Sequence, residues 1–74
     1  MTANEINALK KKFGNHLKGI REKKKLTLAD VEAGCSLEAS RISKIEQGRF
    51  NISLSTIVEL AKGLEIDSYE LLKF

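Results

Sequence analysis

The stretch between residues 26 and 48 constrains the fold of this chain more than any other part of it. Thr27 is followed three residues later by Asp30, which resembles a helix capping box with Asp in place of the usual Glu or Gln. Gly34 is expected to end this helix after about two turns, because glycine weakens a helical pattern. The stretch is therefore predicted to begin with one short helix and a tight turn.

A second short helix is predicted to begin near Glu38 and to bury one narrow stripe. Ile42 and Ile45 lie three residues apart, so they fall on the same face about one turn apart. At about 100° per residue, four polar residues share the arc that faces away from these isoleucines: Ser40, Ser43, Lys44 and Gln47. These side chains donate hydrogen bonds, and a short polar helix braced from behind fits a major groove, so the pattern favours DNA binding.

Three signatures in and after this second helix are shared with a known family. They are IxxIExG at 42–48, SLxT at 53–56 and LAxxL at 60–64. In this order they resemble the lambda-repressor-like and Xre-type helix-turn-helix regulators, over residues from about 13 to 72. The resemblance implies an all-α fold, a compact five-helix DNA-binding domain with its helix-turn-helix at about 27–47, and double-stranded operator DNA as the partner.

The first helix is predicted to start at a cap on Asn4 and to end near Lys24. Its apolar residues fall within one narrow arc: Ile6, Leu9, Phe13, Leu17 and Ile20. Gly14 and Gly19 each weaken the helix by up to about 1 kcal/mol relative to alanine, so tertiary packing must hold it. Residues 1–12 precede the family resemblance and are expected to extend this helix, either as a purely structural addition or as a contact for a second subunit.

Two more helices are predicted towards the C-terminus. Ser53 is a natural cap for the first of them, and its expected core face comprises Leu54, Ile57, Val58, Ala61 and Leu64. Asp67 and Glu70 resemble a capping box for a short last helix. The family resemblance implies a homodimer contact within about residues 66–74. The expected contact residues are Tyr69, Leu71, Leu72 and Phe74.

The resemblance also assigns roles to residues in and around the second helix. Its base-reading positions correspond to Ala39, Ser40, Ser43 and Lys44. Lys44 is expected to donate to a guanine. The expected phosphate-binding residues are Arg41, Arg49, Asn51 and Ser53. Arg21 and Glu46 are expected to form a structural ion pair that orients the second helix, rather than to read bases.

Three residues depart from the family pattern. Leu28 stands where a glutamine often helps to hold a phosphate, Glu32 replaces an alanine at the contact of the two helices, and Ser36 replaces a glycine in the turn. Glu38 is also awkward beside DNA phosphates. Leu28, Glu32 and Glu38 therefore support an alternative function, a protein-interaction module of antitoxin or adaptor type that keeps the fold and has lost DNA binding.

Length and charge agree with one small domain spanning residues 1–74. Residues 1–26 contain eight Lys/Arg and two Glu, whereas residues 50–74 contain two Lys and four acidic residues. This distribution favours a basic end that meets phosphates, with a solvated lysine-rich helix as the alternative. Cys35 is the only cysteine, which excludes an intrachain disulfide and fits a cytosolic setting.

Several classes of protein are excluded by what the sequence lacks. No apolar run approaches transmembrane length and no signal peptide is visible, so no membrane partner is expected and the predicted localisation is cytoplasmic. There is no Cys–His or Ser–His–Asp arrangement, no phosphate-cradling glycine loop and no metal cluster. We therefore expect no enzymatic activity, no metal, no cofactor and no small-molecule ligand.

The leading prediction is a sequence-specific transcriptional regulator, such as a repressor, that binds a palindromic operator as a homodimer. Its two recognition helices would lie about 34 Å apart, one turn of duplex. Within the family, the chain resembles controller proteins of restriction–modification systems, phage repressors and antitoxin components. The segments FGxxLKxIR at 13–21 and RxNISL at 49–54 favour the controller type.

Overall fold

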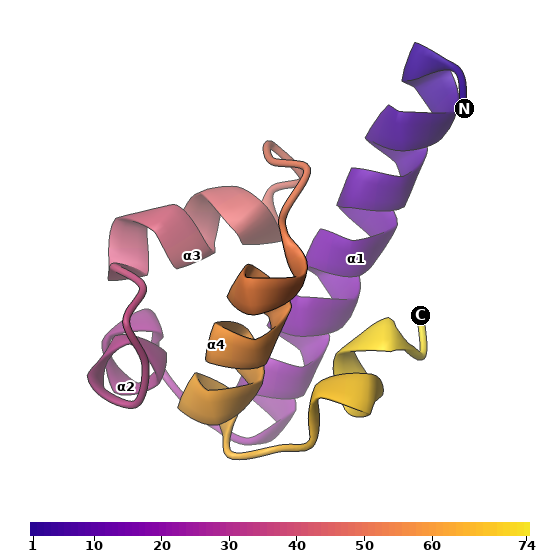
Figure 1. Cartoon of the computed structure of the whole chain (residues 1–74). Helices are drawn as coiled ribbons and strands as arrows, with labels where there is room; N and C mark the ends of the chain where they lie inside the picture. The colour runs from indigo at the N-terminus through magenta and orange to yellow at the C-terminus, as the bar shows by residue number, and fades with distance from the viewer.

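The computed structural model describes all 74 residues, and every regular element in it is helical (Figure 1). Four α-helices follow one another as α1 (Ala3–Lys23), α2 (Leu28–Ala33), α3 (Ala39–Glu46) and α4 (Leu54–Leu64). A short 3₁₀ helix, η1 (Ser68–Leu72), ends the chain beside α1 and α4. The N-terminal half of α1 projects beyond the rest of the molecule (Figure 1). The all-α class and the helix-turn-helix arrangement are confirmed. No helix has both the length and the apolar composition needed to cross a membrane.

The prediction of a fifth α-helix is wrong, because Ser68–Leu72 adopts 3₁₀ geometry. Asp67 precedes this segment, but its side chain makes no capping hydrogen bond. Only its backbone carbonyl is used, accepting from Glu70 N at 3.0 Å. Helical segments of only a few residues often adopt i→i+3 bonding.

The starts of α1 and α2 follow local capping patterns, with one correction. The predicted cap on Asn4 is wrong: Thr2 Oγ1 accepts from Glu5 N at 3.1 Å, and Glu5 Oε1 accepts from Thr2 N at 2.8 Å. The predicted capping box at the start of α2 is confirmed, with the corresponding bonds of Thr27 and Asp30 at 3.0 and 2.8 Å. These bonds favour the ionised carboxylates, so they lower the pKa of Glu5 and of Asp30.

The core draws on every helical element of the chain. Its buried residues are Phe13, Leu17, Val31, Ile42, Ile45, Leu60, Ala61, Leu64 and Leu71. Cys35 is half-buried against this core. Two residues expected in the core of α4 lie outside it, since Leu54 is 78% exposed and Val58 is 46% exposed. Leu9 of the predicted α1 arc is also exposed, because the first turns of α1 extend past the elements that could cover them.

Gly14 is required where α1 meets α3. A Cβ atom at this position would lie 2.4 Å from the carbonyl oxygen of Glu46 and 2.6 Å from that of Ile45. Any side chain would therefore push the C-terminal end of α3 away from α1. At Gly19, in contrast, an added Cβ would meet nothing within 4 Å.

The two glycines give a matched test of this contact. We expect Gly14→Ala to lower the free energy of unfolding by about 1–3 kcal/mol, because the added methyl overpacks a backbone contact. Gly19→Ala is expected to raise it by up to about 1 kcal/mol, because alanine is the better helix former and the space is open. Urea denaturation measures both changes. A stabilising effect of both substitutions would contradict the close contact.

Candidate nucleic-acid interface

Helix α3 is held by one face and presents the other to solvent. Ile42 and Ile45 are fully buried, and they pack α3 against the body of the molecule. Of the residues predicted to read bases, Ser40 and Lys44 are exposed, whereas Ala39 and Ser43 are half-buried. The outer face of α3 is therefore polar, and its two most accessible predicted contacts lie one turn apart.

Arg21 and Glu46 form a two-point ion pair that joins α1 to the end of α3. Arg21 Nε donates to Glu46 Oε2 at 2.6 Å, and Arg21 Nη2 donates to Glu46 Oε1 at 3.0 Å. A third bond runs from Arg21 Nη1 to the carbonyl oxygen of Leu26 at 2.9 Å. The hydrogen bonds to the Glu46 carboxylate raise the pKa of Arg21 above its ordinary value. Both charges are used within the chain, which leaves neither side chain free to read DNA.

A carboxylate from α2 caps the start of α3, which the sequence analysis missed. Glu38 occupies the cap position of α3, yet its side chain makes no capping hydrogen bond. Instead, Glu32 Oε2 accepts from Ala39 N at 2.9 Å. Glu32 was interpreted as a disturbance at the helix contact, whereas here it links the two helices of the motif. The signal in the sequence was a cap position without Ser, Thr, Asp or Asn.

A second carboxylate fixes the turn between α2 and α3 from α4. Glu59 Oε1 accepts from Ser36 N at 2.9 Å, and Glu59 Oε2 accepts from Lys62 Nζ at 3.2 Å. The bond from the Ser36 backbone is the main reason why the pKa of Glu59 is lowered. Sequence reasoning could not have found this contact, because the two residues are 23 positions apart.

A polar groove of about 390 Å³ runs between α1, the start of α2 and α3. It is lined by Asn15, Lys18, Arg21, Leu28, Ser43, Glu46 and Gln47. Lys18 is exposed and takes part in none of the three ion pairs of the structure, so it supplies uncompensated positive charge beside the outer face of α3. Leu28 lines the groove with an apolar side chain that is half-buried against the core, so it contributes no polar group. Lys18 was not among the predicted phosphate-binding residues.

The loop after α3 contains three of the four predicted phosphate-binding residues. Gly48 begins it with φ of 75°, a left-handed conformation that glycine adopts easily. The side chains of Arg49 and Asn51 are exposed, whereas Ser53 Oγ is occupied, accepting from Thr56 N at 3.3 Å to cap α4. The Ser53 hydroxyl therefore caps α4 as an acceptor, and its O–H can still donate to a phosphate.

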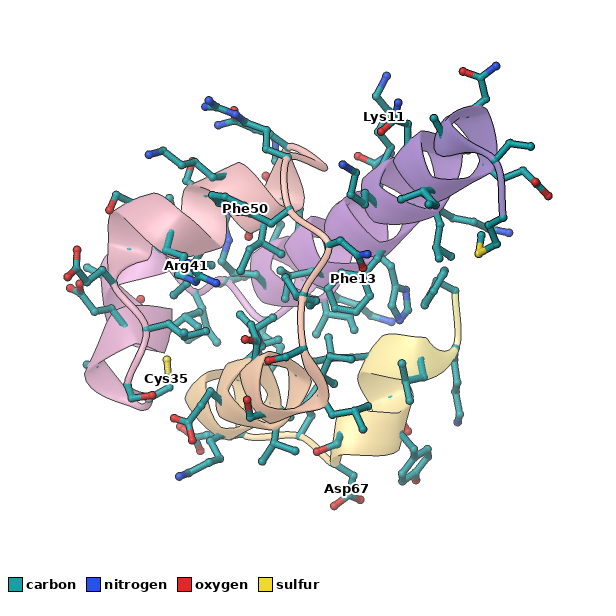
Figure 2. The ribbon with its side chains drawn as sticks, turned by 45° about the horizontal axis from the view of Figure 1, so that its top comes forward. Lys11, Phe13, Cys35, Arg41, Phe50 and Asp67 are labelled. Carbon is teal, nitrogen blue, oxygen red and sulfur yellow. The ribbon has the colours of Figure 1, made fainter.

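Arg41, the fourth predicted phosphate-binding residue, is braced by Phe50. Its guanidinium carbon lies 5.2 Å from the centroid of the Phe50 ring, within the range of a cation–π contact (Figure 2). Phe50 is half-buried against the core and lies beneath this guanidinium group. Arg41 itself stays exposed, so its charge faces solvent on the flank of α3.

The predicted dimer contact needs one correction. Leu71 is completely buried within its own chain, so its side chain cannot contact a partner. Phe74 is half-buried, with its ring edge-on to Phe13 at a centroid distance of 5.7 Å. Beside it, His16 Nε2 lies 2.7 Å from the Glu70 carbonyl oxygen and fastens η1 to α1. Of the predicted residues, Tyr69 and Leu72 remain more than half exposed.

A second helix anchored by the buried Val31, a third helix with an exposed polar face and basic residues around it define a helix-turn-helix DNA-binding domain. The helix-turn-helix family HTH_3 matches residues 17–71, and the chain belongs to this family. It is a DNA-binding transcriptional regulator, and the proteins it resembles are regulators rather than enzymes.

Two relatives match over most of their length. Control protein C.MunI from a Mycoplasma species is 37% identical over 67 residues, which cover 89% of this chain and 90% of that protein. The HTH-type transcriptional regulator y4dJ of Sinorhizobium fredii is 33% identical over 63 residues, covering 85% and 82% respectively. The predicted resemblance to Xre-type regulators and to controller proteins is confirmed.

Two solved structures share the fold. The restriction-modification controller protein C.AhdI from Aeromonas hydrophila superposes with a TM-score of 0.81 at 34% identity, covering 88% of this chain and 94% of its own. The clp gene regulator ClgR from C. glutamicum gives a TM-score of 0.78 at 22% identity, covering 86% and 83%. At that identity, the likeness to ClgR concerns the fold alone.

The capping role of Glu32 can be tested by removing its carboxylate and then supplying a cap from a different residue. Glu32→Ala is expected to lower the free energy of unfolding by about 1 kcal/mol, the usual loss when a helix cap is removed. Adding Glu38→Ser to this variant places a capping hydroxyl within α3 and should restore most of the loss. Urea denaturation of the three proteins decides the point. Unchanged stability of the Glu32→Ala variant would show that the bond to Ala39 contributes nothing.

Proposed function

We propose that the chain recognises a palindromic operator as a homodimer and inserts α3 of each protomer into the major groove. The observation that carries this proposal is the polar, exposed outer face of α3, opposite the buried Ile42 and Ile45. Lys44 donates to O6 and N7 of a guanine, and Ser40 reaches a base edge one turn earlier. Ala39 and Ser43 lie closer to the body of the protein and complete the base-reading set.

Residues on both sides of α3 bind the DNA backbone in this proposal. On one side, Arg49 and Asn51 present exposed side chains from the loop after α3, and Ser53 adds the N-terminus of α4. Arg41 reaches a phosphate from the flank of α3, with its guanidinium steadied by Phe50. On the other side, Lys18 in the polar groove makes a phosphate contact that the apolar side chain of Leu28 cannot make.

The homodimer would bury the apolar side chains that α4 and η1 leave exposed. They are Leu54, Val58, Tyr69 and Leu72, and the half-buried Phe74 follows η1. Helix α4 and η1 pack against each other, so these residues belong to neighbouring elements. A second copy of the chain covers them and doubles the number of base pairs that are read, since one short recognition helix alone specifies little.

A controller role in a restriction–modification system is the most specific function that the similarities support. Two of the matched proteins are named as control or controller proteins. The alternative, an interaction module without DNA binding, loses part of its basis. Glu32 is engaged as a helix cap and Leu28 packs against the core, so of the three residues only Glu38 is exposed without a structural role for its side chain.

Lys44 and Arg49 give opposite expectations and serve as mutual controls. Lys44→Ala should weaken binding to an operator by about 1–3 kcal/mol and relax the preference at one base pair per half-site. Arg49→Ala should weaken operator and random duplex equally, because a phosphate contact carries no sequence information. Fluorescence anisotropy with both duplexes measures the difference. Equal losses on both duplexes for Lys44→Ala would contradict its base-reading role.

Leu54 tests the homodimer without disturbing the fold. Leu54→Glu places a charge in the proposed interface, yet glutamate in the first turn of a helix is compatible with the helix dipole. Ser55→Glu adds the same charge at the next, exposed position and serves as the control. Sedimentation equilibrium should show a monomer for Leu54→Glu and a dimer for Ser55→Glu. Dimers of equal strength for both variants would place the interface elsewhere.

A further inference from the structure

The N-terminal half of α1 lies outside the family match, which begins at residue 17. This part of the helix contains Lys10, Lys11 and Lys12, and its only acidic residue is Glu5. Glu5 is used in the capping box at the start of the helix, six residues before Lys11. The extension therefore adds positive charge ahead of the residues that the family model matches.

Lys11 lies directly against the turn that ends α3. A Cβ atom at Gly48 would lie 2.9 Å from Lys11 Cα and 2.8 Å from Lys11 Cγ, so only glycine allows this approach. Gly14, one turn later, makes the corresponding contact with the Glu46 carbonyl. The same face of α1 continues to Lys18, in the polar groove. Lys11 and Lys18 thus lie on either side of the α1–α3 contact.

The charge of Lys11 is uncompensated in this position. Its side chain is exposed and takes part in none of the three ion pairs of the structure. The nearest carboxylate along α3, that of Glu46, is bound by Arg21. Arg49 directly follows Gly48, which adds a second exposed cation to the same turn. In Figure 2, Lys11 and α3 lie towards one edge of the molecule, and Asp67 lies at the opposite edge.

We propose that Lys11 binds a backbone phosphate of the operator next to the one held by Arg49. The extended first helix then forms part of the DNA interface, rather than only a structural addition. A lysine suits this role, because its ammonium group is a compact point charge on a flexible stem and binds phosphate without demanding one orientation. This inference depends on the proposed function, since it assumes that α3 enters the major groove.

The dependence of affinity on salt measures phosphate contacts directly. For duplex DNA, the logarithm of the binding constant falls with the logarithm of salt concentration, with a slope of about −0.9 for each phosphate neutralised. Lys11→Met keeps the aliphatic stem against Gly48 and removes the charge. The matched control is Lys12→Met, which removes the same charge about 100° further around the helix, away from Gly14. Thermal unfolding of both variants verifies that they remain folded.

We expect the slope of Lys11→Met to be shallower by about 0.9 for each bound protomer, on operator and random duplex alike. The slopes of Lys12→Met and of Lys11→Arg should equal that of the wild-type protein. Equal slopes for Lys11→Met and Lys12→Met would overturn the phosphate contact while leaving the proposed function intact. A wild-type protein that binds no duplex even at low salt would overturn both.

Discussion

The direction in which the outer face of α3 projects depends on how closely α3 meets α1. Arg21 holds Glu46 through two hydrogen bonds of 2.6 and 3.0 Å, and Gly14 lets the two backbones touch beside this pair. A buried ion pair contributes little net stability, because the loss of hydration opposes the attraction between the charges. The planar, two-point geometry of the pair instead fixes the orientation of α3 relative to α1. The polar face of α3 therefore projects from the body at one defined angle.

Carboxylates engaged within the fold surround the surface that we propose meets DNA. Glu46 is bound to Arg21, Glu32 caps α3, and Glu59 holds the turn through the backbone of Ser36. Each carboxylate is oriented by its partner, while Lys18, Lys44 and Arg49 keep their charges free. Acidic residues near a nucleic-acid site are thus compatible with DNA binding when the fold itself uses them.

Short-range patterns predicted most of the fold, and long-range contacts account for what they missed. Thr27 with Asp30 and the Ile42–Ile45 stripe depend on residues within one or two turns, so they could be read from the sequence. The cap from Glu32 and the bond from Ser36 N to Glu59 cross between elements, and no local pattern names these partners. Amphipathic periodicity cannot separate a core face from an interface, which explains the errors at Leu54 and Leu71. The base-reading and phosphate-binding residues remain predictions.

The central claim is that two copies of α3 read a symmetric operator, and selection from a pool of random duplexes tests it most directly. The wild-type protein is incubated with the pool at low salt, and the bound fraction is amplified and sequenced over several rounds. We expect enrichment of an inverted repeat whose half-sites lie about 34 Å apart, one helical turn. Enrichment of no sequence, with retention of duplexes irrespective of their sequence or of none at all, would contradict recognition of an operator by α3.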